Sequence, residues 1–531
     1  MKKMFFAAMT ILAAQTVIAQ ETYLNAQMAA DDLNGTARYV GMGGAMEALG
    51  ADISTIGSNP AGIGVFRRSN ATVSFGLTTL GDAGSFRDVN KTTASFDQAG
   101  FVYSMKAGKK SYFNFAFNYH KSRNFNQILA ATGTLDGASQ NKVTYNKANN
   151  GTFTLYSDGG TVNGYTSSGY LATTFSQLDY LYANALMYDG DESIYYNDAT
   201  GYTMRSGTTG YIGEYDFNVS GSYDNTIFWG LTVGIKDVHY KGVSSYTETL
   251  VDDEGSTIGD VTVDDRRKIT GTGIDVKAGI IFRPVTESPF RIGLYVHTPT
   301  WYDLTTTNVT TLQNGAYSSG AGLYSSYTIG ETYDYKFYTP WKFGISLGHT
   351  VDKVIALGAT YEFADYGTCD IRVNDGGYYG DYWGGYYDDS HSDEVMNEQT
   401  ERVLRGVSTL KLGLEVKPMD NVSLRLGYNY VSPMYEEHAS KDNSLASYGT
   451  YYSSSTDYVN WKSTNRFSIG AGYAKGKWSA DLTYLYSKTS GDFYPFESYY
   501  DSSDAALNNV ADAVDVDNIR HQVLLTLGYK F

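Results

Sequence analysis

Strict alternation of apolar side chains with small or polar ones is the feature that most constrains the fold of this chain. At the C-terminus, Val523, Leu525, Leu527, Tyr529 and Phe531 alternate with mostly small or polar neighbours. Successive side chains of a β-strand point to opposite faces, so this pattern predicts a strand with one apolar face. The same pattern recurs along the chain and predicts fourteen strands, at residues 70–79, 98–107, 111–121, 211–223, 226–240, 269–283, 289–299, 340–350, 353–364, 407–417, 421–432, 465–475, 477–488 and 520–531.

Most of these segments are long enough to cross a bilayer as tilted strands, which need about 9–11 residues. No run of 18 or more apolar residues occurs after residue 19, so helical membrane spans are not expected. A soluble β-sandwich also alternates, but aromatic residues gather here at the strand ends, as in the girdles of membrane barrels. Tyr529 and the terminal Phe531 lie on the apolar face, and we expect them to form the signal for the barrel-assembly machinery.

The connections between the predicted strands alternate in length. Six short joins alternate with seven long ones, of which the longest fall at residues 121–211 and 364–407. Bacterial outer-membrane barrels have an even number of strands, short periplasmic turns and long external loops. In lipid only a closed sheet satisfies every backbone group. The sequence therefore predicts an all-β fold, a transmembrane antiparallel barrel of about fourteen strands over residues 69–531.

Composition and the first residues agree with an exported protein. Residues 1–19 combine Lys2 and Lys3 with a short apolar run and a small-residue cleavage site, which is typical of a signal peptide. The 531 residues contain 40 Lys and Arg against 57 Asp and Glu, a net charge of −17, so nucleic acid is not an expected partner. Cys369 is the single cysteine, which excludes disulfides and cysteine-based metal clusters. We expect a bacterial outer-membrane location, in contact with membrane lipid and lipopolysaccharide.

Residues 20–68 lack the alternation and are rich in Gly, Ala and apolar side chains. The segment precedes the barrel, is too apolar to hang in the periplasm and is too short to form a domain of its own. Burial in the lumen as a hatch, or plug, is therefore the favoured interpretation. The alternative is a small periplasmic extension.

The segment also resembles a known family. The residues Gly35–Arg38, Gly41–Ala45 and Ala48–Asp52 are followed by Ser58-Asn59-Pro60-Ala61-Gly62-Ile63 directly before the first strand. This run is similar to the hatch of the FadL/TodX family of outer-membrane transporters for long-chain fatty acids and hydrophobic aromatic compounds. The resemblance implies fourteen strands around an N-terminal hatch, with Asn59, Pro60 and Ala61 as the hatch motif. Family members also use a kink in the third strand as a lateral exit, but the predicted third strand here contains neither Gly nor Pro.

The predicted function is passive transport of hydrophobic small molecules, released by movement of the hatch. The inward positions of the barrel carry charged residues, namely Lys277, Lys342, Lys411, Glu415, Arg425 and Asp481, so the lumen is expected to be wet. The hatch would then supply most of an apolar ligand site. Its candidate lining residues are Met42, Met46, Leu49, Ile53, Ile56, Ile63 and Phe66. The same residues could instead simply pack the plug.

Histidines and acidic loops bear on other possible functions. The seven histidines lie in no recognisable hydrolase or metal-binding motif, so neither an enzyme nor a cofactor nor a metal site is expected. The acidic group Asp189, Asp191 and Glu192 lacks a full set of spaced calcium ligands. The acidic, tyrosine-rich loop at 378–389 leaves open a surface adhesin or glycan-binding barrel, and scattered histidines leave open a haem-uptake receptor. A general porin is disfavoured because the hatch would occlude it.

Overall fold

The computed structural model describes residues 21–81, 84–188, 194–316, 325–379 and 386–531. The predicted signal peptide and the acidic group Asp189, Asp191 and Glu192 lie outside these residues, as do residues 380–385 of the tyrosine-rich loop.

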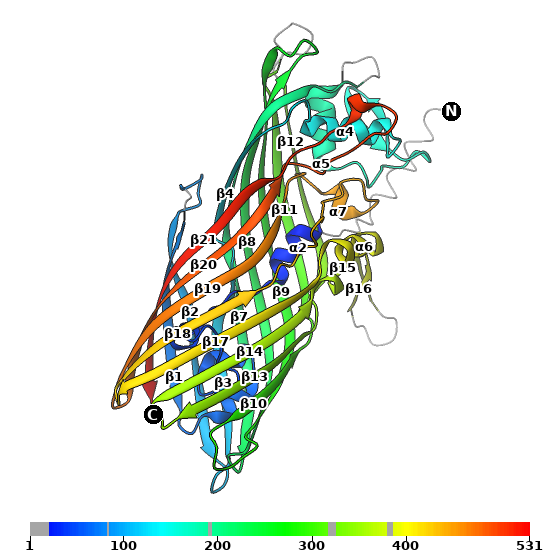
Figure 1. Ribbon diagram of the computed structural model, residues 1–531. Coiled ribbons are helices and arrows are strands. Elements are labelled where there is room, and N and C mark those ends of the chain that lie inside the picture. Colours follow the sequence, from blue (N-terminus) through cyan, green and yellow to red (C-terminus); the bar gives the residue numbers. More distant parts are fainter. Residues whose placement is uncertain (1–20, 82–83, 189–193, 317–324, 380–385) are drawn as a thin grey trace.

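Fourteen antiparallel strands close into a barrel, as the alternation predicted (Figure 1). The first and last strands pair in continuous register from Asn70 opposite Lys530 to Leu80 opposite Arg520, which leaves no open edge in the barrel. The barrel strands are β1 (Asn70–Leu80), β2 (Thr92–Lys106), β3 (Tyr112–Asn124), β7 (Asp198–Tyr223), β8 (Ile227–Val251), β9 (Thr257–Phe282), β10 (Arg291–His297), β13 (Lys342–Val351), β14 (Ile355–Asp365), β17 (Gly406–Met419), β18 (Val422–Val431), β19 (Tyr458–Lys475), β20 (Trp478–Tyr494) and β21 (Val514–Lys530).

Tight turns join the strands at one end of the barrel and long connections at the other (Figure 1). Two of the turns have the left-handed backbone that matches the twist of a β-hairpin. Asp224 and Asn225 have φ values of 46° and 59°, and Asp352 and Lys353 have φ values of 46° and 60°. Both the even strand count and the alternation of short and long connections are confirmed.

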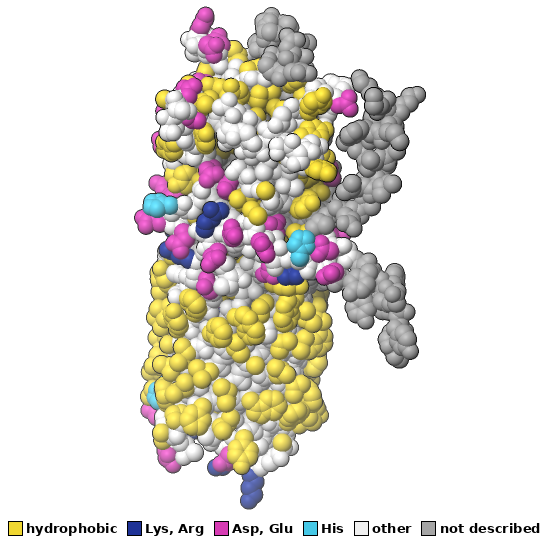
Figure 2. Space-filling view, turned by 90° about the vertical axis from the view of Figure 1, so that its right-hand side faces the viewer, with side chains coloured by type: hydrophobic (Ala, Val, Ile, Leu, Met, Phe, Trp, Pro, Cys, Tyr) yellow, Lys and Arg dark blue, Asp and Glu magenta, His cyan; other side chains and the backbone are white. Residues whose placement is uncertain are grey.

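On the face shown in Figure 2, apolar side chains form a band over the half of the barrel that carries the tight turns, and charged side chains gather directly beyond it. The band is made of the outward positions of the barrel strands, and large apolar side chains such as Phe101, Phe343, Leu426 and Ile469 are exposed by 51%, 54%, 54% and 58%. Such exposure would be costly in water and is favourable against lipid chains.

The strands continue well beyond the apolar band on the loop side. The sequence prediction placed the start of β7 at residue 211 and the end of β8 at residue 240, whereas the strands reach Asp198 and Val251. Beyond the band the outward positions become Thr, Ser and charged residues, so the apolar alternation that marks a lipid-facing strand is lost there. The long connections also contain further strands, namely β4 (Gln127–Thr134), β5 (Thr154–Asp158), β6 (Thr161–Tyr165), β11 (Trp301–Asn314), β12 (Ser325–Tyr338), β15 (Asp370–Tyr379) and β16 (Tyr386–Ser392).

Helices are short and lie in the long connections or inside the barrel. Those in the connections are α4 (Gln140–Asn149), α5 (Gln177–Tyr182), η3 (Ala183–Met187), η4 (Tyr366–Thr368), α6 (Glu394–Val403), α7 (Tyr448–Tyr451) and η5 (Ala505–Leu507). Those before the first strand are α2 (Thr22–Ala29), α3 (Ala37–Gly41), η1 (Ile53–Gly57) and η2 (Pro60–Val65). No helix among the described residues is both long enough and apolar enough to cross a membrane.

Candidate functional site

Residues 21–66, which we call the N-terminal segment, lie inside the barrel (Figure 1). Helix α3 packs against β18, β19, β20 and β21, whereas η2 packs against β7, β8 and β9 on another side of the lumen. Helix α2 lies nearer the long connections, against α6. The segment therefore crosses the lumen and contacts strands on several sides of its wall.

Glycines on neighbouring strands form a flat seat for the backbone of this segment. Gly348, Gly358, Gly413 and Gly427 stand opposite one another in register on β13, β14, β17 and β18. Backbone atoms of Ala48, Ala45, Met42 and Gly43, respectively, lie where side chains on these glycines would stand. The absence of four Cβ atoms thus lets the segment rest directly on the strands.

The motif Asn59-Pro60-Ala61 lies on a second glycine seat. Backbone and side-chain atoms of Asn59 and Pro60 fill the space next to Gly230 and Gly279, which are paired on β8 and β9. The fully buried Asn59 side chain accepts a hydrogen bond from the Ala61 amide at 3.1 Å and donates one to the Glu47 carbonyl at 3.1 Å. This is the side-chain-to-backbone turn that the motif predicts, and it joins two distant parts of the segment.

The seven candidate lining residues are all buried, but they do not surround one pocket. Met42, Met46 and Leu49 pack with Val40 and with Leu485 and Leu524 of the barrel. The other four, Ile53, Ile56, Ile63 and Phe66, form a separate cluster with Val102 and Ala116. None of the seven lines the cavity described below, which lies beside Asp31 and Asp32. In this conformation they pack the segment against the wall.

Four charged residues of the segment, Arg38, Glu47, Asp31 and Asp32, are paired with the wall. Arg38 lies 3.0 Å from Glu415, Glu47 lies 3.0 Å from Lys411, and Asp31 lies 2.5 Å from Lys342. Asp32 faces three guanidinium groups, those of Arg123, Arg520 and Arg466, at 3.2, 3.3 and 3.6 Å. Burial alone would raise the pKa of Asp32, but the three guanidinium groups reverse this effect and hold it at about 2. Lys342, Lys411 and Glu415 point inward as predicted.

The segment also completes the wall where the strand pairing fails. Pairing of β2 with β3 ends at Gln98 opposite His120, and a bulge in β3 follows between Lys121 and Arg123. The third strand is thus kinked by a bulge without Gly or Pro. Asp32 and Asn34 form hydrogen bonds with the backbone of β3 that β2 leaves unpaired. The Asp32 amide donates to the Ser122 carbonyl at 2.8 Å, and the Asn124 amide donates to the Asp32 carboxylate at 2.9 Å. The Asn34 side chain donates to the Lys121 carbonyl at 3.1 Å.

A cluster of buried aromatic side chains surrounds helix α2. Tyr23 stacks on Tyr435 at a centroid distance of 5.1 Å, and its hydroxyl donates to Asn460 at 2.9 Å. Leu24 and Met28 of the same helix are also buried in this cluster. The aromatic members from the barrel and its connections are Phe125, Tyr240, Tyr302, Tyr333, Tyr335, Phe337, Tyr366, Tyr435, Tyr452 and Tyr458. This cluster was not predicted from the sequence, although the alternation of Tyr333, Tyr335 and Phe337 indicates a strand with one aromatic face.

A cavity of about 280 Å³ lies between the charged lumen and this aromatic cluster. Its lining includes Asp31, Asp32 and the three arginines that face Asp32, together with Phe125, Met434, Tyr435 and Trp461. A cavity whose wall holds both guanidinium groups and aromatic rings suits a molecule with an apolar body and an anionic end.

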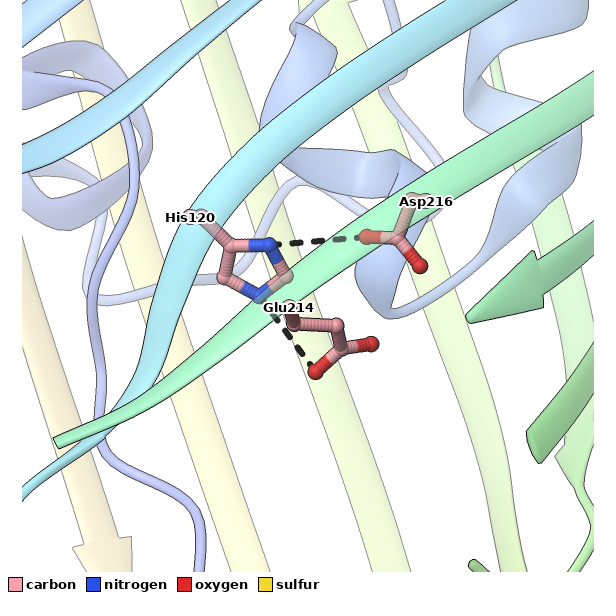
Figure 3. Close-up of side chains that lie close together, drawn as sticks. All are labelled: His120, Glu214 and Asp216. Atoms are coloured by element: carbon pink, nitrogen blue, oxygen red, sulfur yellow. Dashed lines mark ion pairs between the residues drawn. The ribbon is translucent and has the colours of Figure 1, made fainter. Parts of the chain in front are cut away.

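A cluster that the sequence analysis did not anticipate lies on β3 and β7. His120 stands between Glu214 and Asp216, with Nε2 3.8 Å from a Glu214 oxygen and Nδ1 3.4 Å from an Asp216 oxygen (Figure 3). The sequence predicted strands that contain His120 and the pair Glu214 and Asp216, but it did not predict the register that brings these side chains together.

At the end of the chain, Phe531 is 65% exposed and Tyr529 packs on Trp478 at a centroid distance of 4.7 Å. Both lie at the end of the barrel that carries the tight turns, next to the start of β1, where the Phe531 amide donates to the Ser69 carbonyl at 3.1 Å. The terminal aromatic residue is thus available to another molecule.

Several solved structures are similar to this chain in fold. A FadL homologue of Pseudomonas aeruginosa has 12% sequence identity and a TM-score of 0.48, over 94% of this chain and 99% of its own. The toluene transporter TbuX of Ralstonia pickettii has 13% identity and a TM-score of 0.46, and the monoaromatic hydrocarbon channel CymD has 12% and 0.47, each with the same coverage of 94% and 99%. No protein-family model and no curated protein matches the sequence.

Proposed function

We propose that the chain is a passive channel of the bacterial outer membrane for hydrophobic small molecules, and that the N-terminal segment is its hatch. The observation that carries this proposal is the closure of the β3 bulge by Asp32 and Asn34. The wall lacks pairing between β2 and β3 at this point, and the hatch supplies the missing backbone partners. Movement of the hatch would therefore open a side of the barrel within the apolar band.

The outward side of this gap supports a route into the membrane. Phe96 of β2 and Tyr119 of β3 stack across it at a centroid distance of 5.7 Å, and Phe96 is exposed to lipid. A molecule that passes between these rings stays in contact with apolar surface. Exit through the wall avoids the wet, charged end of the lumen, which an apolar molecule crosses only at a cost of about 25 cal/mol per Å² of exposed surface.

The arginine cluster around Asp32 supports an anionic end group on the substrate. Three guanidinium groups face a single carboxylate, which leaves a net charge of plus two beside the cavity. The Asp32 carboxylate leaves this site when the hatch moves. A carboxylate at the end of a long apolar molecule could then take its place, with its chain against Phe125, Tyr435 and Trp461.

A reversible cross-link tests the hatch. The Asn34 amide donates to the Asp97 carboxylate at 3.2 Å, so Asn34→Cys with Asp97→Cys would tie the hatch to β2. Uptake of a fluorescent long-chain fatty acid into cells should stop after oxidation and return after reduction, whereas either single cysteine variant should be unaffected by oxidant. Equal uptake by the oxidised and reduced forms would overturn the hatch mechanism. Surface binding without uptake in any form would favour an adhesin.

A second variant separates the substrate classes. Arg466→Met removes one of the three guanidinium groups and leaves the aromatic residues that line the cavity, Phe125, Tyr435 and Trp461, unchanged. We expect uptake of the fatty acid to fall about tenfold, since a charge-assisted hydrogen bond contributes roughly 1.5–3 kcal/mol, while uptake of toluene is retained. An equal loss for both would place Arg466 in the support of the hatch and would contradict the anionic subsite.

A further inference from the structure

The lumenal faces of β3, β7, β8 and β9 hold a buried cluster of charged residues that no step of the transport proposal uses. His120 stands directly opposite Glu214 across the β3–β7 pairing, and Glu214 stands opposite Lys236. Asp216 and Lys277 complete the inner part of the cluster, where Lys277 lies against Glu214 and 3.0 Å from Asp216. The four side chains other than His120 are at most 7% exposed.

Each of the two carboxylates that flank His120 has one oxygen left for another ligand. The Oε1 atom of Glu214 and the Oδ1 atom of Asp216 are both bonded to the Lys277 ammonium group. The remaining Asp216 oxygen, Oδ2, is buried and has no hydrogen-bond partner. The remaining Glu214 oxygen, Oε2, has the Lys236 ammonium group at 3.7 Å, beyond hydrogen-bond distance. Both remaining oxygens lie beside the His120 ring (Figure 3).

The cluster belongs to a wider network with an excess of acidic groups. Ion pairs join it into one network that contains six carboxylates and four lysines. The carboxylates are those of Asp31, Glu47, Glu214, Asp216, Asp275 and Glu362, and the lysines are Lys236, Lys277, Lys342 and Lys411. With all six carboxylates ionised and neutral imidazole rings, this network carries a net charge of minus two inside the barrel. Buried charge of this kind is costly unless it is paired, and one divalent cation would balance it.

We propose that His120, Glu214 and Asp216 bind a divalent first-row transition metal ion. One nitrogen of His120 and one oxygen from each carboxylate lie within 4.8 Å of one another, and within the described residues this is the one group of three or more possible ligands that meets this distance. Metal bonds of about 2.0–2.2 Å place ligand atoms roughly 3–3.5 Å apart. Side-chain rotations that move these three ligand atoms by about 1–2 Å would therefore complete the site. An imidazole with two carboxylates suits Zn²⁺ or Mn²⁺ better than Mg²⁺ or Ca²⁺, which take oxygen ligands.

The position of the site gives the ion a role in closing the lumen. Gly57 of the N-terminal segment lies directly on His120, so that a Cβ atom on Gly57 would stand 3.1 Å from the ring and 3.5 Å from the unpartnered Asp216 oxygen. Next to it, the His297 ring donates a hydrogen bond to the Ser58 carbonyl at 2.6 Å. A bound ion would fix the His120 ring under this turn. It would therefore hold the segment in place, whatever molecule the barrel transports.

The test is metal binding by the full-length barrel in detergent, after treatment with a chelator. Calorimetric titration with Zn²⁺ and with Mn²⁺ should give about one ion per chain, with Mg²⁺ and Ca²⁺ giving no such binding. His120→Gln and Asp216→Asn should each weaken the affinity at least tenfold. The matched control is His239→Gln, because His239 pairs with Asp237 at 2.9 Å on the exposed surface and should not alter the strong site.

Two further readouts make the result decisive. Co²⁺ in the site should show a visible absorption band that is lost in His120→Gln, and heat-modified mobility on gels should confirm that each variant is a folded barrel. Ions that bind equally well to the His120→Gln and Asp216→Asn variants would lie at surface histidines and would overturn the proposal, as would the absence of Zn²⁺ and Mn²⁺ binding to the folded wild type. Metal binding is measured without any substrate, so its failure would leave the transport proposal untouched.

Discussion

The carbonyl group of Ala45 occupies the space that a Cβ atom on Gly358 would fill. The N-terminal segment therefore rests against bare backbone at this point, and the fit depends on the absence of a single methyl group. The three other glycines of the same seat repeat the arrangement on β13, β17 and β18.

Gly358→Ala should lift the hatch from the wall and make the barrel leak ions. Overpacking of this kind costs about 1–3 kcal/mol, which is enough to shift the closed state. Single-channel recording in planar bilayers should show a higher open probability than in the wild type. Gly108→Ala is the control, because a Cβ there meets its nearest neighbour at an ordinary 3.5 Å. An open probability of Gly358→Ala equal to that of the wild type would contradict the role of these glycines in seating the segment.

Asn59→Ala and Pro60→Ala should impair uptake more than barrel assembly. The Asn59 change removes two buried hydrogen bonds and leaves the Glu47 carbonyl without this partner, at a cost of about 1–3 kcal/mol. The Pro60 change frees the backbone angle that starts η2. Uptake should be divided by the amount of folded barrel, read from heat-modified mobility. An equal loss of folded barrel and of uptake would sink this assignment.

Phe531→Ala should lower the yield of folded barrel several-fold and leave the stability of the folded fraction nearly unchanged. The side chain is 65% exposed, so its removal forfeits little burial. Tyr529→Ala should affect both quantities, because its ring packs on Trp478. Membrane fractions supply the yield, and thermal unfolding of the purified barrel supplies the stability. A large drop in melting temperature for Phe531→Ala would refute the role of the residue as an assembly signal.

The connection between β20 and β21 should loosen as the pH rises. Burial raises the pKa of Glu497 from 4.5 to about 7, and a hydrogen bond from Ser440 at 2.7 Å offsets this only in part. The folded state then holds this proton more tightly than the unfolded state, so stability falls as the pH rises from about 4.5 through 7. Hydrogen exchange, corrected for the intrinsic effect of pH, should show faster opening around Glu497 at pH 8 than at pH 5.5. Glu497→Gln should remove the difference, and a variant that keeps it would assign the effect to other groups.

The barrel could be predicted because lipid imposes a simple rule on each strand. Outward side chains such as those of Leu525 and Leu527 must be apolar, and the strand appears in the sequence wherever this holds. Beyond the apolar band, water relaxes the rule for the outward face, so the outer halves of β7, β8 and β9 were missed. In those halves the inward face carries the apolar side chains, as at Tyr246 and Leu250 of β8.

The sites in the lumen depend on which strands face each other. Asn59 and Pro60 could be singled out because their turn is local. His120 and Glu214 are 94 positions apart in the sequence and meet only through the register of β3 with β7. That register depends on a connection of more than seventy residues, which no local pattern fixes. The clustering of Met42 and Ile53 in separate groups likewise depends on the seats that the wall offers.

Strand β7 is 26 residues long, which at roughly 3.3 Å per residue gives about 85 Å along the chain. With a tilt of about 40° this is roughly 65 Å along the barrel axis, about twice the thickness of the hydrocarbon core. The mouth at the loop end thus stands several nanometres clear of the lipid. A hydrophobic molecule that enters at this mouth has not yet dissolved in the bilayer. Its rate of uptake should therefore follow its concentration in the external solution rather than its partition coefficient between water and the membrane.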